Sequence, residues 1–484
     1  MLLGNTLRYL PTQLLSPIAQ LGSMVLWTHW LSPADLAVFM QVTAAQELAY
    51  LASIGWFSSY ALRHLPDRSD SAARLRYLRT ENMVMLAAVA VGCACAVVAW
   101  LTLPSGPAQA GLLLAIAAMF VTRSAGQHYA ERARAQSAFV AYGVLQLAGP
   151  VGGLVLGWWA MSRLGPSPVL LLTAYAVAQG AGVLLAAPAL GMTRQLGRPN
   201  IDILRAAVAL GAPMLTLAAS AWLGENQIRY TVQWARDAEA LGLLILGWSL
   251  GRRCATVAAT LVTTAAFPLA ARLYNEGRRS EALVQLRLSA LMLMAVLLPV
   301  TTMVALIGGP LLEPLVGSKY RGLSGDLMAL AMVGGAVRNL LIHVIDQLMI
   351  LEKRWRLMIW MDAAELVAGV LLTWAGLMLA EQRGAVIGQG LSGLLMLAVG
   401  IRLCQKYFGF AWPWADTARV LLACAAMAAV LLALKPQVQG TVALLMSATA
   451  GVAAAGAVLA ALFAPKWWRK SWPLWWHLWR RKGE

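Results

Sequence analysis

The sequence predicts an all-α, polytopic membrane protein with about fourteen transmembrane helices, arranged as two six-helix lobes around a central cavity plus two C-terminal helices. Three observations predict this class: the composition, the repeated apolar runs, and the alternating charge of the segments between the runs. Of the 484 residues, 60% are hydrophobic and only 12% are charged, whereas a soluble domain has ~45–50% apolar and ~25% charged residues. This composition excludes a soluble protein, which would need a much larger polar surface.

Apolar runs of about twenty residues recur through the chain, and each is long enough to span a hydrocarbon core of ~30 Å. Lipid offers no partner for backbone N–H and C=O groups, so each run is predicted to be helical. The runs do not alternate polar and apolar residues as the strands of a membrane β-barrel do. The predicted helix cores are 9–29, 36–60, 83–103, 109–128, 138–158, 169–190, 207–224, 239–269, 284–307, 326–350, 358–379, 386–403, 418–434 and 441–464.

The charge of the connecting segments predicts the orientation. If the N-terminus is cytoplasmic, 26 of the 38 Lys and Arg residues lie in inside segments and only 7 in outside segments. Cytoplasmic loops carry such an excess of cations, so we expect a multi-pass protein of the bacterial inner membrane with both termini in the cytoplasm. Most of the net charge of +17 then marks topology and favours anionic membrane lipids as partners, and no nucleic-acid partner is expected. The Trp-rich basic tail from Lys466 to Lys482 predicts an interfacial anchor.

The two halves of the chain resemble each other weakly, at an offset of roughly 200 to 210 residues. We therefore predict an N-terminal lobe at 1–200, a C-terminal lobe at 201–405, and a last helix pair with the basic tail at 406–484. Pro17 and Pro213 occupy corresponding places in the first and seventh predicted helices. Corresponding interruptions in two halves point to a transport pathway, so both prolines are candidate hinges, although Pro is also common in membrane helices.

Catalysis is not supported by the sequence. No large domain lies outside the membrane, the five His residues are scattered, and the five Cys residues lack metal-binding or disulfide spacing. No nucleophile stands beside a His in an assignable pattern. We therefore predict that the protein is not an enzyme and has no cofactor and no metal site.

The arginines within the apolar runs are the leading candidates for a substrate site: Arg123, Arg252, Arg253 and Arg338. A charge near the bilayer centre costs at least ~2.5–3.5 kcal/mol on insertion scales, so it should face water, a partner or a ligand. The planar guanidinium suits a phosphate, which favours an anionic substrate in a cationic cavity. The alternative is neutralisation within the protein, of Arg338 by Asp346 or of another arginine by Glu47 or Glu225. Arg123, expected toward the inner end of its helix, could also snorkel to the interface.

Three further residues are candidates for ion coupling or for neutralisation of these arginines: Glu47, His343 and Asp346. Carboxylates and histidines within membrane helices form the proton relays of pumps and transporters. Asp362 and Glu365 lie near the basic segment 353–356, where an ordinary salt-bridge cluster is the favoured interpretation.

The sequence resembles the multidrug/oligosaccharidyl-lipid/polysaccharide (MOP) exporter superfamily, and within it the Wzx-type polysaccharide or O-antigen repeat-unit flippases. The stretch Gln13–Ala45 is similar to the entry of these flippases, with an apolar helix, a short corner (here Leu31-Ser32-Pro33-Ala34-Asp35) and a second helix. The stretch Phe267–Ala282 is similar to the exit of their eighth helix. The layout of predicted helices resembles that of the family over the whole chain, whereas the amino-acid sequence itself is similar over only a small part of it.

This resemblance implies a flippase that moves undecaprenyl-diphosphate-linked oligosaccharide across the inner membrane by alternating access, in O-antigen (lipopolysaccharide) or exopolysaccharide biosynthesis. It implies that cavity cations meet the diphosphate, and it makes a polysaccharide polymerase and chain-length machinery candidate partners. Three alternatives stay open: a drug or metabolite antiporter of the same superfamily, whose often cationic substrates a cationic cavity would repel; a membrane-embedded polysaccharide polymerase or ligase; and a scaffold of an export complex.

Overall fold

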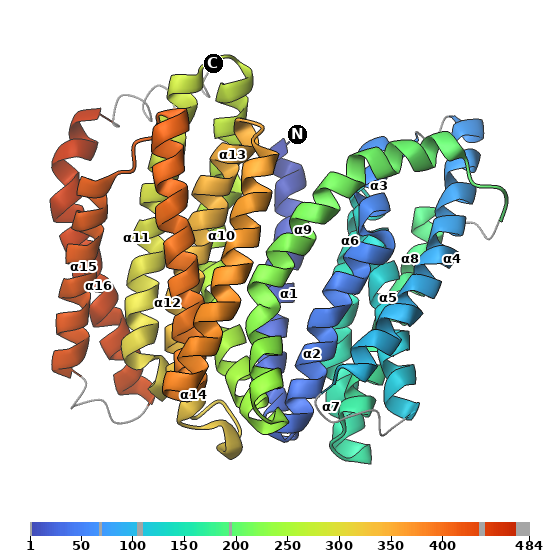
Figure 1. Cartoon of the computed structure of the whole chain (residues 1–484), viewed down its shortest axis with the longest axis horizontal. Helices are drawn as coiled ribbons and strands as arrows, with labels where there is room; N and C mark the ends of the chain where they lie inside the picture. The colour runs from blue at the N-terminus through green and yellow to red at the C-terminus, as the bar shows by residue number, and fades with distance from the viewer. Residues whose placement is uncertain (1, 67–69, 104–109, 193–195, 435–440, 471–484) are drawn as a thin grey trace. The chain divides into compact units, whose positions relative to one another are not determined.

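The computed structural model describes residues 2–66, 70–103, 110–192, 196–434 and 441–470, and these residues form helices joined by short connections, with no strand (Figure 1). The α-helices are α1 (Leu2–Trp27), α2 (Pro33–Tyr50), α3 (Trp56–His64), α4 (Ser71–Leu101), α5 (Ala110–Ala135), α6 (Phe139–Leu147), α7 (Leu154–Leu164), α8 (Pro168–Leu190), α9 (Ile201–Ala235), α10 (Ala238–Asn275), α11 (Arg279–Leu312), α12 (Leu323–Leu340), α13 (Gln347–Leu351), α14 (Trp355–Phe408), α15 (Trp414–Leu434) and α16 (Thr441–Lys470). The basic tail lies largely outside the described residues.

These helices form fourteen helical segments, which confirms the predicted fold class. Three pairs, α2–α3, α6–α7 and α12–α13, continue through a π-turn: η1 (Leu51–Gly55), η2 (Ala148–Gly153) and η4 (Leu341–Asp346). Conversely, α14 contains two helices, because Ala380 and Glu381 leave the helical φ/ψ region in the gap between two predicted cores.

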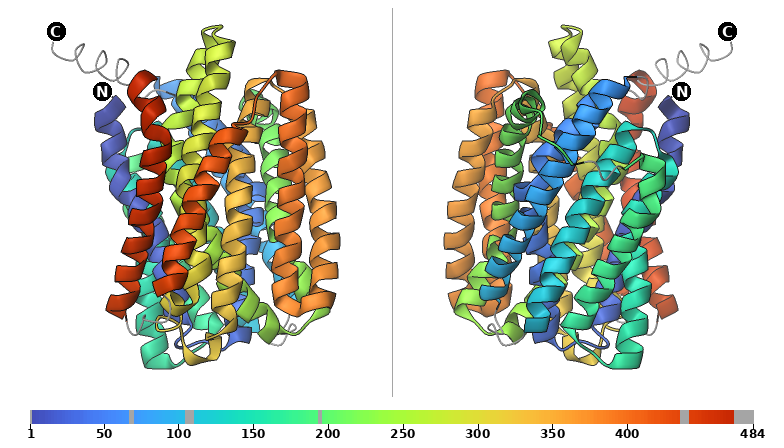
Figure 2. Two further views of the ribbon diagram at one scale, coloured as in Figure 1. Left: turned by 90° about the vertical axis from the view of Figure 1, so that its left-hand side faces the viewer. Right: turned by 90° about the vertical axis from the view of Figure 1, so that its right-hand side faces the viewer.

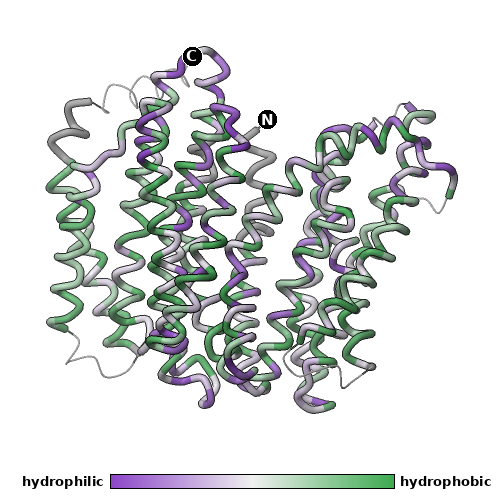
Figure 3. Tube along the Cα trace, in the orientation of Figure 1, coloured by the Kyte–Doolittle hydropathy of each residue, from purple (hydrophilic) through white to green (hydrophobic). Residues whose placement is uncertain are grey.

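Among the described residues, nine helices are long and apolar enough to cross a membrane, or ten if the bent α10 counts as one span. Hydrophobic residues cover the middle of the helices and hydrophilic residues gather near their ends (Figure 3). The chain is therefore a multi-pass membrane protein.

The chain divides into two compact units. Unit 1 comprises Met1–Ile245 with Val316–Tyr320, and unit 2 comprises Leu246–Leu315 with Arg321–Glu484. In unit 1, α5 is the central helix, since it packs against α2, α3, α4, α6 and α8. In unit 2, α12 packs between α11 and α14. The helices α15 and α16 lie side by side and pack against α11 (Figure 2). The lobe boundaries at residues 200 and 405 remain a prediction.

Local sequence signals set the ends of several helices. Ser32 caps α2: its hydroxyl accepts a hydrogen bond from the backbone N–H of Asp35, and Pro33 occupies the first helical turn. Ser and Asn satisfy otherwise unpaired N–H groups at helix starts, and Asn200 likewise accepts from two N–H groups of α9. Gly191 ends α8 in the left-handed conformation, which glycine adopts without steric cost. The Ser-Pro-x-Asp corner noted in the sequence is therefore a helix start.

Several helices extend beyond their predicted cores. The segment α4 begins at Ser71 rather than near 83, α5 continues to Ala135 rather than 128, and α9 runs from Ile201 to Ala235 rather than from 207 to 224. A helix predicted from an apolar run ends at the first charged residue, whereas the backbone hydrogen bonds of the actual helix continue past that residue. Charged residues that were predicted to lie in loops are consequently inside helices, and some of them are buried.

Candidate functional site

Arg123 and Glu47 form an ion pair in unit 1. Arg123 lies in the middle of α5, not toward the end of the helix as expected, because α5 continues to Ala135. Glu47 lies near the middle of the continuous segment α2–η1–α3. The Arg123 Nη2 atom is 3.6 Å from Glu47 Oε1, and the side chains are 25% and 51% exposed. The structure thus brings together one predicted substrate residue and one predicted neutralising residue.

Polar side chains surround this pair on α2 and α5. Gln46 is fully buried and donates from Nε2 to Ser124 Oγ and to Gln127 Oε1, each at 3.3 Å. The Gln46 Oε1 atom is buried without a hydrogen-bond partner among the described residues. Arg123 and Gln127 are four residues apart, so they lie on the same face of α5. Unit 1 therefore has a polar patch, Gln46, Glu47, Arg123, Ser124 and Gln127, at mid-helix.

Arg252 and Arg253 lie within α10, and both side chains are partly buried. The Arg252 guanidinium carbon lies 5.6 Å from the centre of the Trp248 ring, within the range of a cation–π contact. Trp248 is itself held by α14, because its Nε1–H donates to Gln389 Oε1 at 2.6 Å. An aromatic ring thus fixes one of the two adjacent arginines.

Arg338 is 5% exposed and donates from Nη1 to a carboxylate oxygen of Glu365 on α14. Glu365, which was expected to pair with the basic segment 353–356, is therefore an ion-pair partner of Arg338. Asp346, which the sequence had suggested as the partner of Arg338, interacts with it electrostatically. His343 and Asp346 lie on the π-turn η4, which directly follows α12. The Nδ1 atom of His343 is buried without a hydrogen-bond partner among the described residues. Arg338 is thus committed to a buried internal partner.

Unit 1 contains a buried polar cluster that was not predicted from the sequence. His128 links Ser58 and Glu81: its Nδ1 is 2.9 Å from Ser58 Oγ, and its Nε2 is 3.0 Å from Glu81 Oε1. Arg132 donates to Glu81 Oε2 at 2.5 Å and to the carbonyl of Leu190 at the end of α8 at 2.8 Å. These four side chains are at most 1% exposed.

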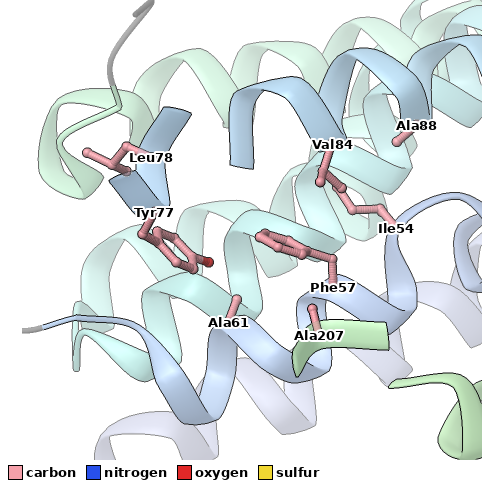
Figure 4. Packing of buried hydrophobic residues seen from close by; sticks show 8 residues of the cluster. All are labelled: Ile54, Phe57, Ala61, Tyr77, Leu78, Val84, Ala88 and Ala207. Atoms are coloured by element: carbon pink, nitrogen blue, oxygen red, sulfur yellow. The ribbon is translucent and has the colours of Figure 1, made fainter. Parts of the chain in front are cut away.

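This cluster corrects the expectation that no nucleophile stands beside a histidine. Its serine, histidine and carboxylate have the order of a catalytic triad, yet Ser58 and His128 are buried, so no substrate reaches them in this structure. Two aromatic side chains lie against the cluster. The rings of Phe57 on α3 and Tyr77 on α4 are stacked with centroids 5.8 Å apart (Figure 4), and the Phe57 ring lies 5.9 Å from the His128 ring. The cluster therefore ties α3, α4, α5 and α8 together. The spacing of His128 and Arg132, four residues apart on α5, is the sequence signal that could have found it.

Further predicted positions lie in α1, in α9 and around the connection between α10 and α11. Pro17 lies inside α1 and Pro213 inside α9, and their role as hinges stays a prediction. Arg229, expected in an outside loop, is a buried residue of α9 that donates to the carbonyl of Met40 at 3.0 Å.

The stretch Phe267–Ala282 spans the end of α10 and the start of α11. In the connection, the hydrogen bond from Arg272 lowers the pKa of Glu276.

Comparisons with known proteins give structural relatives only. No protein-family model and no curated protein matches the chain. The structure of the lipid II flippase MurJ, in an inward closed conformation, superposes with a TM-score of 0.73 at 10% identity, covering 94% of this chain and 99% of that chain.

Two MATE transporters superpose less closely. An inward-facing MATE family transporter of the MOP superfamily has a TM-score of 0.59 at 15% identity, covering 81% of this chain and 94% of its own. A mutant of the Vibrio cholerae MATE transporter VcmN has a TM-score of 0.52 at 15% identity, covering 83% of this chain and 97% of that chain. At such identities the likeness is one of fold. The chain has the all-α transporter fold that MurJ and the MATE transporters share.

Proposed function

We propose that the protein is a flippase that moves an oligosaccharide linked to undecaprenyl diphosphate across the inner membrane, by alternating access. The fold of a lipid II flippase, similar over almost the whole of both chains, supports this function. Arginines within apolar helices carry the substrate assignment: Arg123 of unit 1 and the adjacent Arg252 and Arg253 of unit 2. A guanidinium matches a phosphate in charge and in hydrogen-bond geometry.

Arg338 contributes differently under this proposal. Its bond to Glu365 and its burial favour a role in holding α12 against α14, because breaking a buried ion pair leaves an uncompensated charge. Asp346 and His343 remain candidates for ion coupling. Polysaccharide polymerase and chain-length proteins remain candidate partners.

Reconstitution tests the proposal directly. Liposomes with the purified protein and an NBD-labelled, undecaprenyl-diphosphate-linked oligosaccharide are treated with dithionite, which bleaches only the accessible leaflet. We expect full bleaching with the protein and about half without it. The variant Arg252→Gln/Arg253→Gln should flip at least tenfold more slowly, because it removes two charges that meet the diphosphate. The control Arg134→Gln should flip normally, since Arg134 pairs with its neighbour Glu131 at an exposed helix end.

The alternative functions give different results in the same vesicles. A drug antiporter on this fold would accumulate a fluorescent organic cation and leave half of the lipid protected, and this result would overturn the proposal. A polymerase or ligase would change the mass of the glycan without changing its leaflet. The second outcome would likewise contradict a flippase.

A further inference from the structure

We propose that Glu47 is the release residue of an anion-exchange site on unit 1. Glu47 pairs with Arg123 when the site is empty, is displaced by an anionic diphosphate, and takes Arg123 back as the anion leaves. This inference rests on the proposed function and deepens it, because it describes how one of the arginines that meet the headgroup binds it and which group returns that arginine to its resting state.

The geometry of the pair permits exchange. The separation of 3.6 Å between Arg123 Nη2 and Glu47 Oε1 is an ion-pair contact that is longer than an ordinary N–H···O hydrogen bond. Half of the Glu47 side chain and a quarter of the Arg123 side chain are exposed. An exposed ion pair of this kind favours the paired over the separated arrangement of its side chains by about fivefold or less. An incoming diphosphate with two charges therefore competes successfully for the guanidinium.

Two other intramembrane Arg–Glu pairs of the described residues do not permit exchange. Arg132 and Glu81 are 2.5 Å apart and at most 1% exposed, and the side chains of Arg338 and Glu365 are 6% and 11% exposed. Breaking a buried pair disfavours the folded state by roughly a hundredfold to several thousandfold. Of these three pairs, the one formed by Arg123 and Glu47 is the one from which a ligand can take an arginine.

The position of Glu47 indicates that water reaches the pair. The carboxylate is exposed near the middle of its helix segment, and an ionised side chain facing hydrocarbon at that depth is strongly disfavoured. This face of unit 1 must therefore be wet, so a hydrated headgroup can approach it. Gln127, on the same face as Arg123, offers an amide to the sugar that follows the diphosphate.

Replacing the two partners should change the affinity for the anion in opposite directions. Replacing Glu47 by Gln removes the competing charge, so the anion should bind about fivefold more tightly. Replacing Arg123 by Gln removes the attracting charge, so the anion should bind at least tenfold more weakly. The two effects should not add: in the Arg123→Gln background, Glu47→Gln should have no tightening effect, because the carboxylate then has no arginine to compete for.

Binding to the full-length protein in detergent is measured for wild type, both single variants and the double variant. Two probes are used, undecaprenyl diphosphate by native mass spectrometry and inorganic pyrophosphate by calorimetry. Glu281→Gln is the matched control, because Glu281 pairs with the exposed Arg278 near the start of α11 in unit 2. Circular dichroism and gel filtration verify that each variant is folded.

The outcomes separate this inference from the proposed function. Tightening by Glu47→Gln that disappears without Arg123 supports the exchange site. Binding of the lipid diphosphate with no tightening by Glu47→Gln overturns the exchange site and leaves the flippase intact. If Glu47→Gln tightens and Arg123→Gln weakens the binding of pyrophosphate, but the lipid does not bind, the anion site is supported and the lipid substrate is contradicted. Failure of wild type to bind either probe contradicts both.

Discussion

Arg123 in unit 1 and Arg338 in unit 2 both form ion pairs with a glutamate, but the two pairs differ in burial. Each lies within an apolar helix and pairs with a glutamate on another helix. The Arg338 pair is hydrogen-bonded and nearly buried, whereas the Arg123 pair is a longer contact with both side chains accessible. Burial therefore separates an arginine that holds helices together from one that can bind a ligand. The charge pattern of the sequence does not make this distinction.

The largest effect is expected where a pair is fully buried. Replacing Glu81 by Leu should destabilise unit 1 by about 3–5 kcal/mol, because it leaves the charge of Arg132 buried without its partner. The double variant Glu81→Leu/Arg132→Met should be markedly more stable than this single variant, since no uncompensated charge remains. Thermal unfolding in detergent measures both. Equal stability of the single variant and wild type would refute the structural role of the cluster.

A somewhat smaller loss is expected for the nearly buried pair of unit 2. Arg338→Met should cost about 3 kcal/mol, because Glu365 then stays behind at 11% exposure. Restoring stability with Glu365→Leu in the same chain should also restore flipping, if Arg338 serves packing and not the substrate. Flipping that stays lost in a stable double variant would return Arg338 to the list of substrate residues.

The accessible pair should behave in the opposite way. Arg123→Gln should change stability by less than about 1 kcal/mol, the range of exposed ion pairs, and yet should reduce flipping at least tenfold. The comparison of melting temperature with flipping rate in proteoliposomes checks both parts. A large fall in melting temperature would show that Arg123 is structural like Arg338.

The smallest effect is expected for an ion pair at the exposed end of unit 2. Arg383 and Asp326 are 2.6 Å apart, and both side chains are 56% exposed. Arg383→Gln should shift stability by at most about 0.5 kcal/mol, and high salt should abolish that shift, because exposed pairs are screened. Melting curves at low and high ionic strength test it. An effect that salt does not alter would mean that exposure is a poor guide to the strength of these pairs.

Much of the fold was predictable, because lipid forces each apolar run into a helix. Even the break in α14 at Ala380 and Glu381 falls in a predicted gap. The π-turns were not predictable, since they depend on packing between helices. The buried cluster was missed because Glu81 and Arg132 lie beyond the apolar cores and were assigned to loops, although the helices continue through them.

The candidate site was predictable in residue type and not in pairing. Arginines in apolar runs stand out in a sequence, and Glu47 was among the expected partners. The choice of Glu365 for Arg338 and of Glu47 for Arg123 depends on which helices pack together, and no spacing along the chain encodes it. The difference in exposure, on which the functional assignment rests, is a property of the packed structure alone.

The most direct test of an exchangeable arginine is the turnover of Glu47→Gln in proteoliposomes at saturating lipid-linked oligosaccharide. A release residue predicts opposite changes: the apparent affinity rises about fivefold and the maximal flipping rate falls by a similar factor. The rate falls because the anion leaves more slowly when no carboxylate reclaims Arg123. An unchanged or faster maximal rate, with tighter binding, would contradict the account.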